Sequence, residues 1–146
     1  MDHVLGDIPL RQWVLSVPYE LRLLLAKSPE ALNAVARLFV EQITRFQRER
    51  AGAAGVKAPK TGAIVFPQRF GGSLNLNVHF HVAVPDGVYT VANNSGNETA
   101  TANFHPLAQP TQRDLDEITH NVNARVCAWL KQRISPERER ERVQRC

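Results

Sequence analysis

The chain has 146 residues, a length that suits one domain with a single hydrophobic core. Its 18 lysines and arginines exceed its 14 aspartates and glutamates, and this modest excess of positive charge favours a polyanionic partner. The two cysteines, Cys127 and Cys146, are too few for a disulfide framework and indicate a reducing compartment. No apolar run is long enough to cross a bilayer and no signal peptide is evident, so we expect a cytoplasmic protein without a membrane partner.

The first part of the chain predicts one strand followed by two helices. Residues 11–18 form a short apolar run of strand-forming residues that a proline ends, which is typical of a buried strand. A leucine-rich helical segment spans residues 19–27. Ser28 and Pro29 then have the residue types of an N-cap and a first helical position, so a second helix should extend to about Arg50. Its apolar residues recur at intervals of three and four and form one buried stripe: Leu32, Val35, Phe39, Ile43 and Phe46.

The most informative stretch is Leu74–Val84, which reads Leu-Asn-Leu-Asn-Val-His-Phe-His-Val-Ala-Val. In a strand the side chains alternate between two faces, so one face is apolar and the other carries Asn75, Asn77, His79 and His81. The Cα atoms of the two histidines should be roughly 6.5 to 7 Å apart, which lets both imidazoles bind one divalent ion. Two half-exposed histidines on an edge strand would show the same spacing. Four successive hydrogen-bonding residues on one face favour a functional site.

A hairpin should precede this strand. Residues 62–70 predict a strand, and Gly71-Gly72 has the composition of a two-residue turn. Such a turn would place Gln68 opposite Asn75, about two pairs from His79. We therefore expect Gln68 to contact substrate rather than to act as a third metal ligand.

The remainder of the chain predicts a second hairpin and a final helix. Strands over residues 88–92 and 99–105 should follow a turn at Asp86-Gly87. Thr111 and Asp114 have the spacing of a capping box at the start of the last helix.

The order strand, helix, hairpin, hairpin, helix predicts an α+β fold with a mostly antiparallel sheet of about five strands and flanking helices. We expect residues 1–134 to form this domain. Residues 135–146 lack core-forming side chains and predict a charged, disordered tail.

Four runs of the sequence resemble a known family. They are Arg-Gln-Trp-Val-Leu-Ser-Val-Pro at 11–18, Gln-Arg-Phe-Gly at 68–71, Leu-Asn-Leu-Asn-Val-His-Phe-His at 74–81 and Asp-Gly-Val-Tyr at 86–89. Together they are similar to the central part of the transposases of rolling-circle insertion sequences, the two-tyrosine branch of the HUH endonucleases. The run that contains the two histidines is the most specific of the four.

The resemblance implies a metal-dependent enzyme that nicks and joins single-stranded DNA in DNA transposition. His79 and His81, with Phe80 between them, match the histidine pair that holds Mg²⁺ or Mn²⁺ in this superfamily, usually with a third polar ligand. A tyrosine hydroxyl attacks phosphorus there and leaves a 5′-phosphotyrosine. The chemistry is general, since a metal offsets charge on phosphoryl oxygens and a covalent intermediate keeps the bond available for rejoining.

The sequence also departs from the family pattern. It shows neither the upstream cysteine-rich zinc-binding segment nor the downstream tyrosine motif on a later helix. Its two tyrosines are Tyr19 and Tyr89, and a half-buried core position is the alternative for each. Tyr89 is a weak candidate for the catalytic nucleophile. We therefore expect a partial transposase, whose own catalysis the sequence leaves open.

Two other functional classes remain open. A non-catalytic module that binds single-stranded nucleic acid would use the same polar residues that we predict as DNA contacts, although exposed aromatic residues for base stacking look scarce: Gln68, Arg69, Asn75 and Asn77. A different metal-dependent hydrolase would use the two histidines with an activated water. Its third ligand is not evident, with Asn77, Asp86 and His105 as the nearby candidates.

Overall fold

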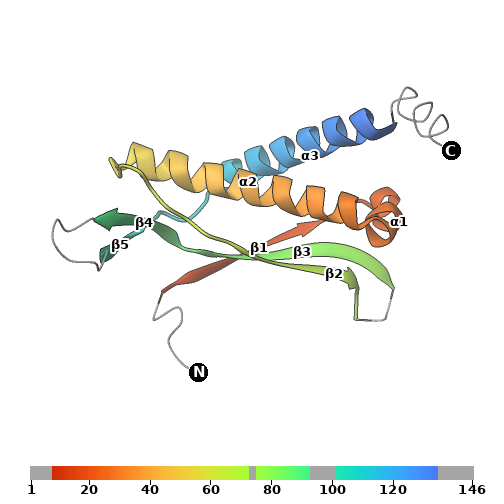
Figure 1. The fold of residues 1–146 in the computed structure, drawn as a ribbon, viewed down its shortest axis with the longest axis horizontal. Coiled ribbons are helices and arrows are strands. Elements are labelled where there is room, and N and C mark those ends of the chain that lie inside the picture. Colours follow the sequence, from red (N-terminus) through yellow and green to blue (C-terminus); the bar gives the residue numbers. More distant parts are fainter. Residues whose placement is uncertain (1–7, 73–74, 93–100, 135–146) are drawn as a thin grey trace, which may run out of the picture. The chain divides into compact units, whose positions relative to one another are not determined.

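The computed structural model describes residues 8–72, 75–92 and 101–134. Its elements, in chain order, are β1 (Leu10–Ser16), α1 (Tyr19–Lys27), α2 (Pro29–Ala53), β2 (Ile64–Phe70), β3 (Leu76–Pro85), β4 (Gly87–Ala92), β5 (Thr101–Pro106) and α3 (Gln112–Ile134) (Figure 1). All the strand pairs among them are antiparallel, which confirms the predicted α+β class. Within the described ranges, no helix has the length and apolar character needed to cross a membrane.

The chain forms two compact units, Met1–Gln109 and Pro110–Cys146. The first contains all the described strands, which make two sheets where a single sheet was expected. β3 is the central strand of the sheet β1-β3-β2, and β4 pairs only with β5 among the described strands. The separation occurs at Asp86, where the chain turns from β3 into β4. Gly87 follows directly and lies so close to β5 that a Cβ atom there would overlap the ring of Phe104.

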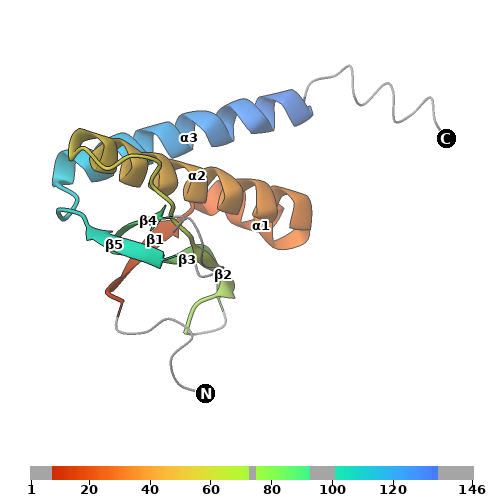
Figure 2. The same ribbon diagram turned by 60° about the vertical axis from the view of Figure 1, so that its left-hand side comes forward.

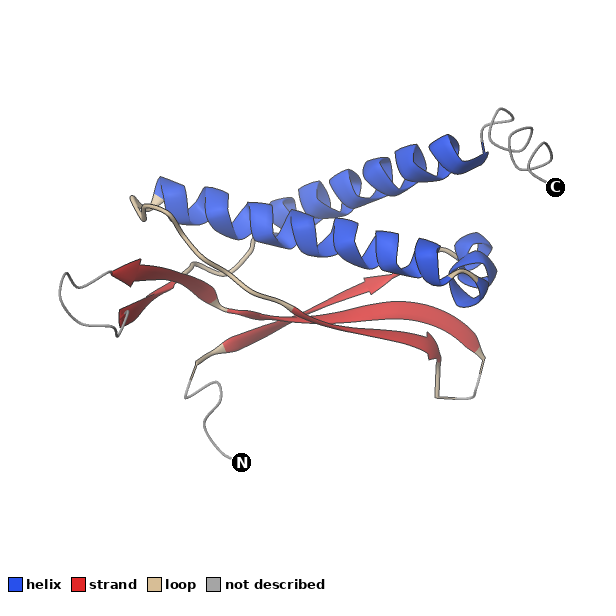
Figure 3. Ribbon diagram, viewed as in Figure 1, coloured by secondary structure: helices blue, strands red, loops and turns tan. Residues whose placement is uncertain are grey.

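α2 covers one face of the three-stranded sheet (Figures 2 and 3). The helix begins as its sequence predicts, because the Ser28 hydroxyl oxygen accepts a hydrogen bond of 3.1 Å from the backbone N–H of Ala31. The ring of Phe46 on α2 meets the ring of Trp13 on β1 edge to face, with 6.0 Å between their centroids. Among the described residues, the buried apolar side chains of α2 and β3 make up most of the core: Ala31, Leu32, Ala34, Val35, Leu38, Phe39, Ile43, Ala51, Val78, Phe80, Val82 and Val84.

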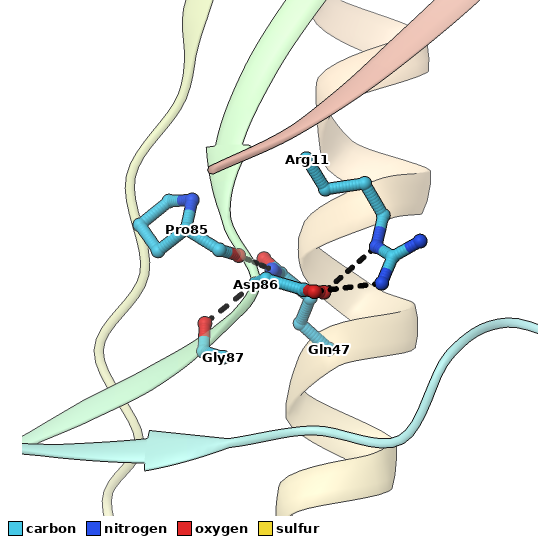
Figure 4. A network of polar contacts seen from close by, with 5 residues as sticks. All are labelled: Arg11, Gln47, Pro85, Asp86 and Gly87. Atoms are coloured by element: carbon cyan, nitrogen blue, oxygen red, sulfur yellow. Dashed lines mark hydrogen bonds and ion pairs between the residues drawn. The ribbon is translucent and has the colours of Figure 1, made fainter. Parts of the chain in front are cut away.

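A polar network holds the corner between β3 and β4 (Figure 4). The side-chain amide of the buried Gln47 on α2 donates to the carbonyl oxygens of Pro85 at 2.7 Å and Gly87 at 3.4 Å. Arg11 on β1 binds the carboxylate of Asp86 through two nitrogens, each at 2.7 Å. Carbonyl groups buried at a strand end would be costly without partners, so this network stabilises the end of the sheet where β4 departs.

The second unit contains α3. Its predicted capping box is confirmed, since the backbone N–H of Thr111 donates to Asp114 Oδ2 at 2.7 Å and the N–H of Asp114 donates back to Thr111 Oγ1 at 3.3 Å. The predicted charged tail, residues 135–146, lies outside the described residues.

Substitution of two phenylalanines of the same sheet should change the free energy of unfolding by very different amounts. Phe80 is 0% exposed beneath α2, whereas Phe66 on β2 is 54% exposed. Phe80→Ala should lower the free energy of unfolding by about 3 to 5 kcal/mol because it leaves a cavity. Phe66→Ala should lower it by about 1 kcal/mol or less. Urea denaturation followed by circular dichroism measures both, and equal losses would contradict the assignment of the two faces.

Candidate functional site

His79 and His81 lie together on the face of the sheet opposite the core. Exposure alternates along β3, with Val78, Phe80 and Val82 at 0% and both histidines partly exposed. The centroids of the two imidazole rings are 4.9 Å apart and their planes are inclined by 70°. The prediction that both histidines share one face of a central strand is confirmed. Two nitrogens bound to one ion at ~2.1 Å each are at most ~4.2 Å apart, and neighbouring rings at this spacing are compatible with that limit.

Each ring has one nitrogen engaged in a hydrogen bond. His79 Nδ1 lies 2.7 Å from the carbonyl oxygen of Asn77. A carbonyl oxygen can only accept, so in the neutral ring Nδ1 carries the hydrogen and Nε2 keeps the lone pair. His81 Nδ1 lies 2.6 Å from the side-chain amide nitrogen Nε2 of Gln12 on β1. The Nδ1 atoms are thus both occupied, and in the His79 ring Nε2 is the nitrogen available to an ion.

The pairing of β2 with β3 differs from the predicted register. Gln68 lies directly opposite His79, not opposite Asn75. Two features explain the difference: Phe70 pairs with Leu76, so residues 71–75 connect the strands where a two-residue turn was expected, and the register shifts between Gln68 and Phe70. Directly opposed residues of antiparallel strands share a face. Gln68 is therefore a neighbour of the histidine pair. The prediction that Gln68 lies too far from His79 to be a third metal ligand was wrong.

The two histidines have different neighbours on the flanking strands. His79 lies between Ser16 on β1 and Gln68 on β2, which are both polar. His81 lies between Val14 and Phe66, which are each 54% exposed. The site therefore has a polar half, suited to binding an ion or a phosphate, and an apolar half. Sequence reasoning missed Ser16 and Val14 as neighbours of the histidines because it had no means of pairing β1 with β3. It missed Phe66 because the two-residue turn that it assumed shifts the register of β2.

Asn75, Asn77 and Arg69 are the other residues that the sequence predicts as DNA contacts. Asn77 lies on the same strand as the histidines, and its backbone carbonyl orients His79. Asn75 precedes β3, and its carbonyl accepts a bond of 2.9 Å from the N–H of Gly71. Arg69 lies at the register shift of β2, an irregularity of the kind that re-aims side chains at functional sites.

The two tyrosines differ in access. The hydroxyl oxygen of Tyr89 is buried and has no hydrogen-bond partner among the described residues, so it is poorly placed to attack a substrate. Tyr19 is 77% exposed at the start of α1. The guanidinium of Arg22 lies 5.9 Å from its ring centroid and bonds the carbonyl of Leu76 at the start of β3. Tyr19 is thus the accessible tyrosine, near the strand that carries the histidines.

The remaining candidates for a third ligand have other partners. Asp86 is paired with Arg11, and His105 bonds the hydroxyl of Thr90 at 2.8 Å in the other sheet. No group of three or more His, Cys, Asp or Glu side chains in the described part of the chain is arranged to hold a metal. Any ion at the histidine pair would need ligands of another kind, such as an amide oxygen, water or a phosphate.

Comparison with protein families matches residues 62–145, from just before β2 through α3, to the family described as "Putative transposase" (Y2_Tnp). The match covers more than half of the 146 residues. The chain belongs to this transposase family. Its matched region contains both histidines and Gln68. Comparisons with curated proteins and with solved structures give no match.

The observed register of this transposase chain can be tested by cross-linking. Opposed Cα atoms of antiparallel strands are about 4.5 to 5.5 Å apart, within the range of a disulfide. With Cys127→Ser and Cys146→Ser in the background, Gln68→Cys with His79→Cys should oxidise to an intramolecular disulfide. Gln68→Cys with Asn75→Cys should not, since Asn75 is four positions from His79, or about 13 Å. Mass spectrometry after mild oxidation distinguishes them, and the reverse result would restore the two-residue turn.

Proposed function

We propose that this transposase chain binds single-stranded DNA and one divalent cation, Mg²⁺ or Mn²⁺, and acts on a phosphodiester bond of that DNA during transposition. Within its family we assign it to the HUH endonucleases of rolling-circle insertion sequences, acting in the cytoplasm. The observation that carries the proposal is the adjacent pair His79 and His81 on an open sheet face, with Gln68 opposite His79.

The side chains present suit such a cation. His79 presents Nε2, because its Nδ1 is bonded to a backbone carbonyl. Gln68 adds an amide oxygen, and oxygen ligands suit Mg²⁺ and Mn²⁺. We therefore assign His79, His81 and Gln68 as the residues that would hold the ion. A cation bound there would offset negative charge on the phosphoryl oxygens.

The same face has features that suit a single strand of DNA. Phe66 lies beside His81 and is 54% exposed, so its ring can stack on a base. Phe70, at the end of β2, is 57% exposed but pairs with Leu76, which lies on the other face of the sheet. Phe66 thus supplies on the histidine face an exposed aromatic side chain of the kind that DNA binding by base stacking requires. The excess of lysine and arginine favours contact with phosphates, and we expect the affinity to fall as salt is added.

Neither tyrosine of the chain is well placed to act as the nucleophile. The hydroxyl of Tyr89 is buried, which argues against Tyr89 as the catalytic nucleophile. Tyr19 is exposed but lies at the start of α1, outside the sheet face that carries the histidines. We infer that water is the attacking group in the isolated chain and that the phosphodiester is hydrolysed without a covalent intermediate.

Metal binding tests the assigned ligands. The wild-type chain should bind Mn²⁺ in isothermal titration, and the double variant His79→Ala, His81→Ala should not. Gln68→Ala should weaken binding by about tenfold, since it removes one ligand of three or a group that orients one. His105→Ala is the matched control, because His105 is a partly exposed strand histidine of the other sheet, and it should bind like wild type. Equal affinity of all four proteins would contradict the site.

DNA cleavage tests the attacking group. Incubation with labelled single-stranded oligonucleotides and Mn²⁺ should give slow hydrolysis that the His79→Ala, His81→Ala variant lacks. Denaturing electrophoresis should show no protein–DNA adduct. An adduct that persists in Tyr89→Phe and disappears in Tyr19→Phe would contradict the use of water and assign the attack to Tyr19. Binding of DNA without any hydrolysis would favour the non-catalytic module.

A further inference from the structure

We propose that Gln12 is a positioning residue for the metal site, which holds His81 in the form that can bind the ion. In this arrangement the side-chain oxygen of Gln12 accepts the hydrogen on Nδ1 of His81 and leaves Nε2 with its lone pair. The inference rests on the proposed metal site and adds a residue from β1 to it.

The side chain of Gln12 contacts the imidazole ring of His81 from the neighbouring strand. Gln12 pairs with Ala83, and His81 lies two positions from Ala83 on the same face of β3. The Gln12 side chain therefore reaches diagonally across the sheet, and in the structure its amide nitrogen Nε2 lies 2.6 Å from His81 Nδ1. The proposed arrangement exchanges the amide nitrogen and oxygen at this position, because the two atoms are not distinguished by shape. The residues directly opposite His81 are Val14 and Phe66, which have no polar side-chain atom. Among the residues that the structure describes, Gln12 makes the only hydrogen bond to the His81 ring.

The chemistry of the pair allows two arrangements. In one, the amide nitrogen donates to Nδ1, which places the ring hydrogen on Nε2 and removes the lone pair that an ion needs. In the other, the terminal amide is turned by about 180°, an exchange that leaves the shape of the side chain unchanged, and the amide oxygen accepts from Nδ1–H. The orientation of the Gln12 amide thus selects which nitrogen of the His81 ring keeps the lone pair.

His79 shows which arrangement suits the site. Its Nδ1 is bonded to a backbone carbonyl, which can only accept, so its Nε2 is free. The centroids of the two rings are 4.9 Å apart. Both rings can offer an Nε2 lone pair to one ion only if His81 also carries its hydrogen on Nδ1. The oxygen of Gln12 is the group that selects this form. Residues that orient and fix the tautomer of a ligating histidine in this way typically change metal affinity by about 10- to 100-fold when removed.

Three variants separate this role from a structural one. Gln12→Met keeps the length of the side chain and removes the hydrogen bond, whereas Gln12→Glu keeps an acceptor and loses the donor. Gln112→Met is the matched control, the same substitution at an exposed glutamine of α3 whose side chain bonds Asp116 and takes no part in the proposed site. Circular dichroism and urea denaturation establish that all three proteins are folded as wild type.

The first readout is the tautomer in the metal-free protein, from the ¹⁵N chemical shifts of the imidazole nitrogens. In wild type, Gln12→Glu and Gln112→Met, we expect the neutral His81 ring to carry its hydrogen on Nδ1. In Gln12→Met the His81 shifts should move toward the form with hydrogen on Nε2. The His79 shifts should not move in any variant, because the partner of that ring is a backbone carbonyl.

The second readout is Mn²⁺ affinity by isothermal titration. Gln12→Met should bind about 10- to 100-fold more weakly, and Gln12→Glu should stay within a few-fold of wild type. Unchanged His81 shifts and unchanged affinity in Gln12→Met would overturn the role of Gln12 and leave the metal site intact. A wild-type chain that binds no Mn²⁺ would overturn the metal site and the positioning role together, even if the tautomer responds to Gln12.

Discussion

The burial of one face of β3 against α2 is the constraint on which the site depends. Val78, Phe80 and Val82 are completely shielded from solvent, and Val84 nearly so. Because side chains alternate strictly along a strand, burying these residues forces the residues between them onto the opposite face. His79 and His81 therefore share a face for reasons of packing. A slip of one residue would place both histidines in the core, at the cost of exposing four apolar side chains.

Local sequence signals were sufficient for the elements and for part of the site. α1 spans Tyr19–Lys27 as predicted, and Ser28 caps α2 because hydroxyl, proline and apolar periodicity act within a few residues. The same holds for the alternation of β3, which depends only on neighbours in the sequence. The α+β class followed from the order of such segments, although their division into two sheets did not. That division depends on the corner at Asp86 and its contacts with β1.

The missed features all depend on pairing between strands. Gln68 was assigned to the wrong partner because the register shift near Arg69 and the length of the following connection are not visible in the residues. The contact of Gln12 with His81 joins positions 69 residues apart, and no local pattern encodes it. Exposure of Phe66 was missed for a related reason. A strand rich in apolar residues looks buried on both faces until the position of the covering helix is known.

The pairing of β3 with its two neighbours also has a consequence for the order of folding. β2 and β3 form a local hairpin, in which Phe70 pairs with Leu76 only six positions later. β1 comes from much further away, since Ser16 pairs with His79 across 63 positions. By loop-closure entropy, this tenfold greater separation makes the second pairing costlier by about 2 kcal/mol. We therefore expect the hairpin to bring both imidazoles and Gln68 together before the amino-terminal strand docks beside them.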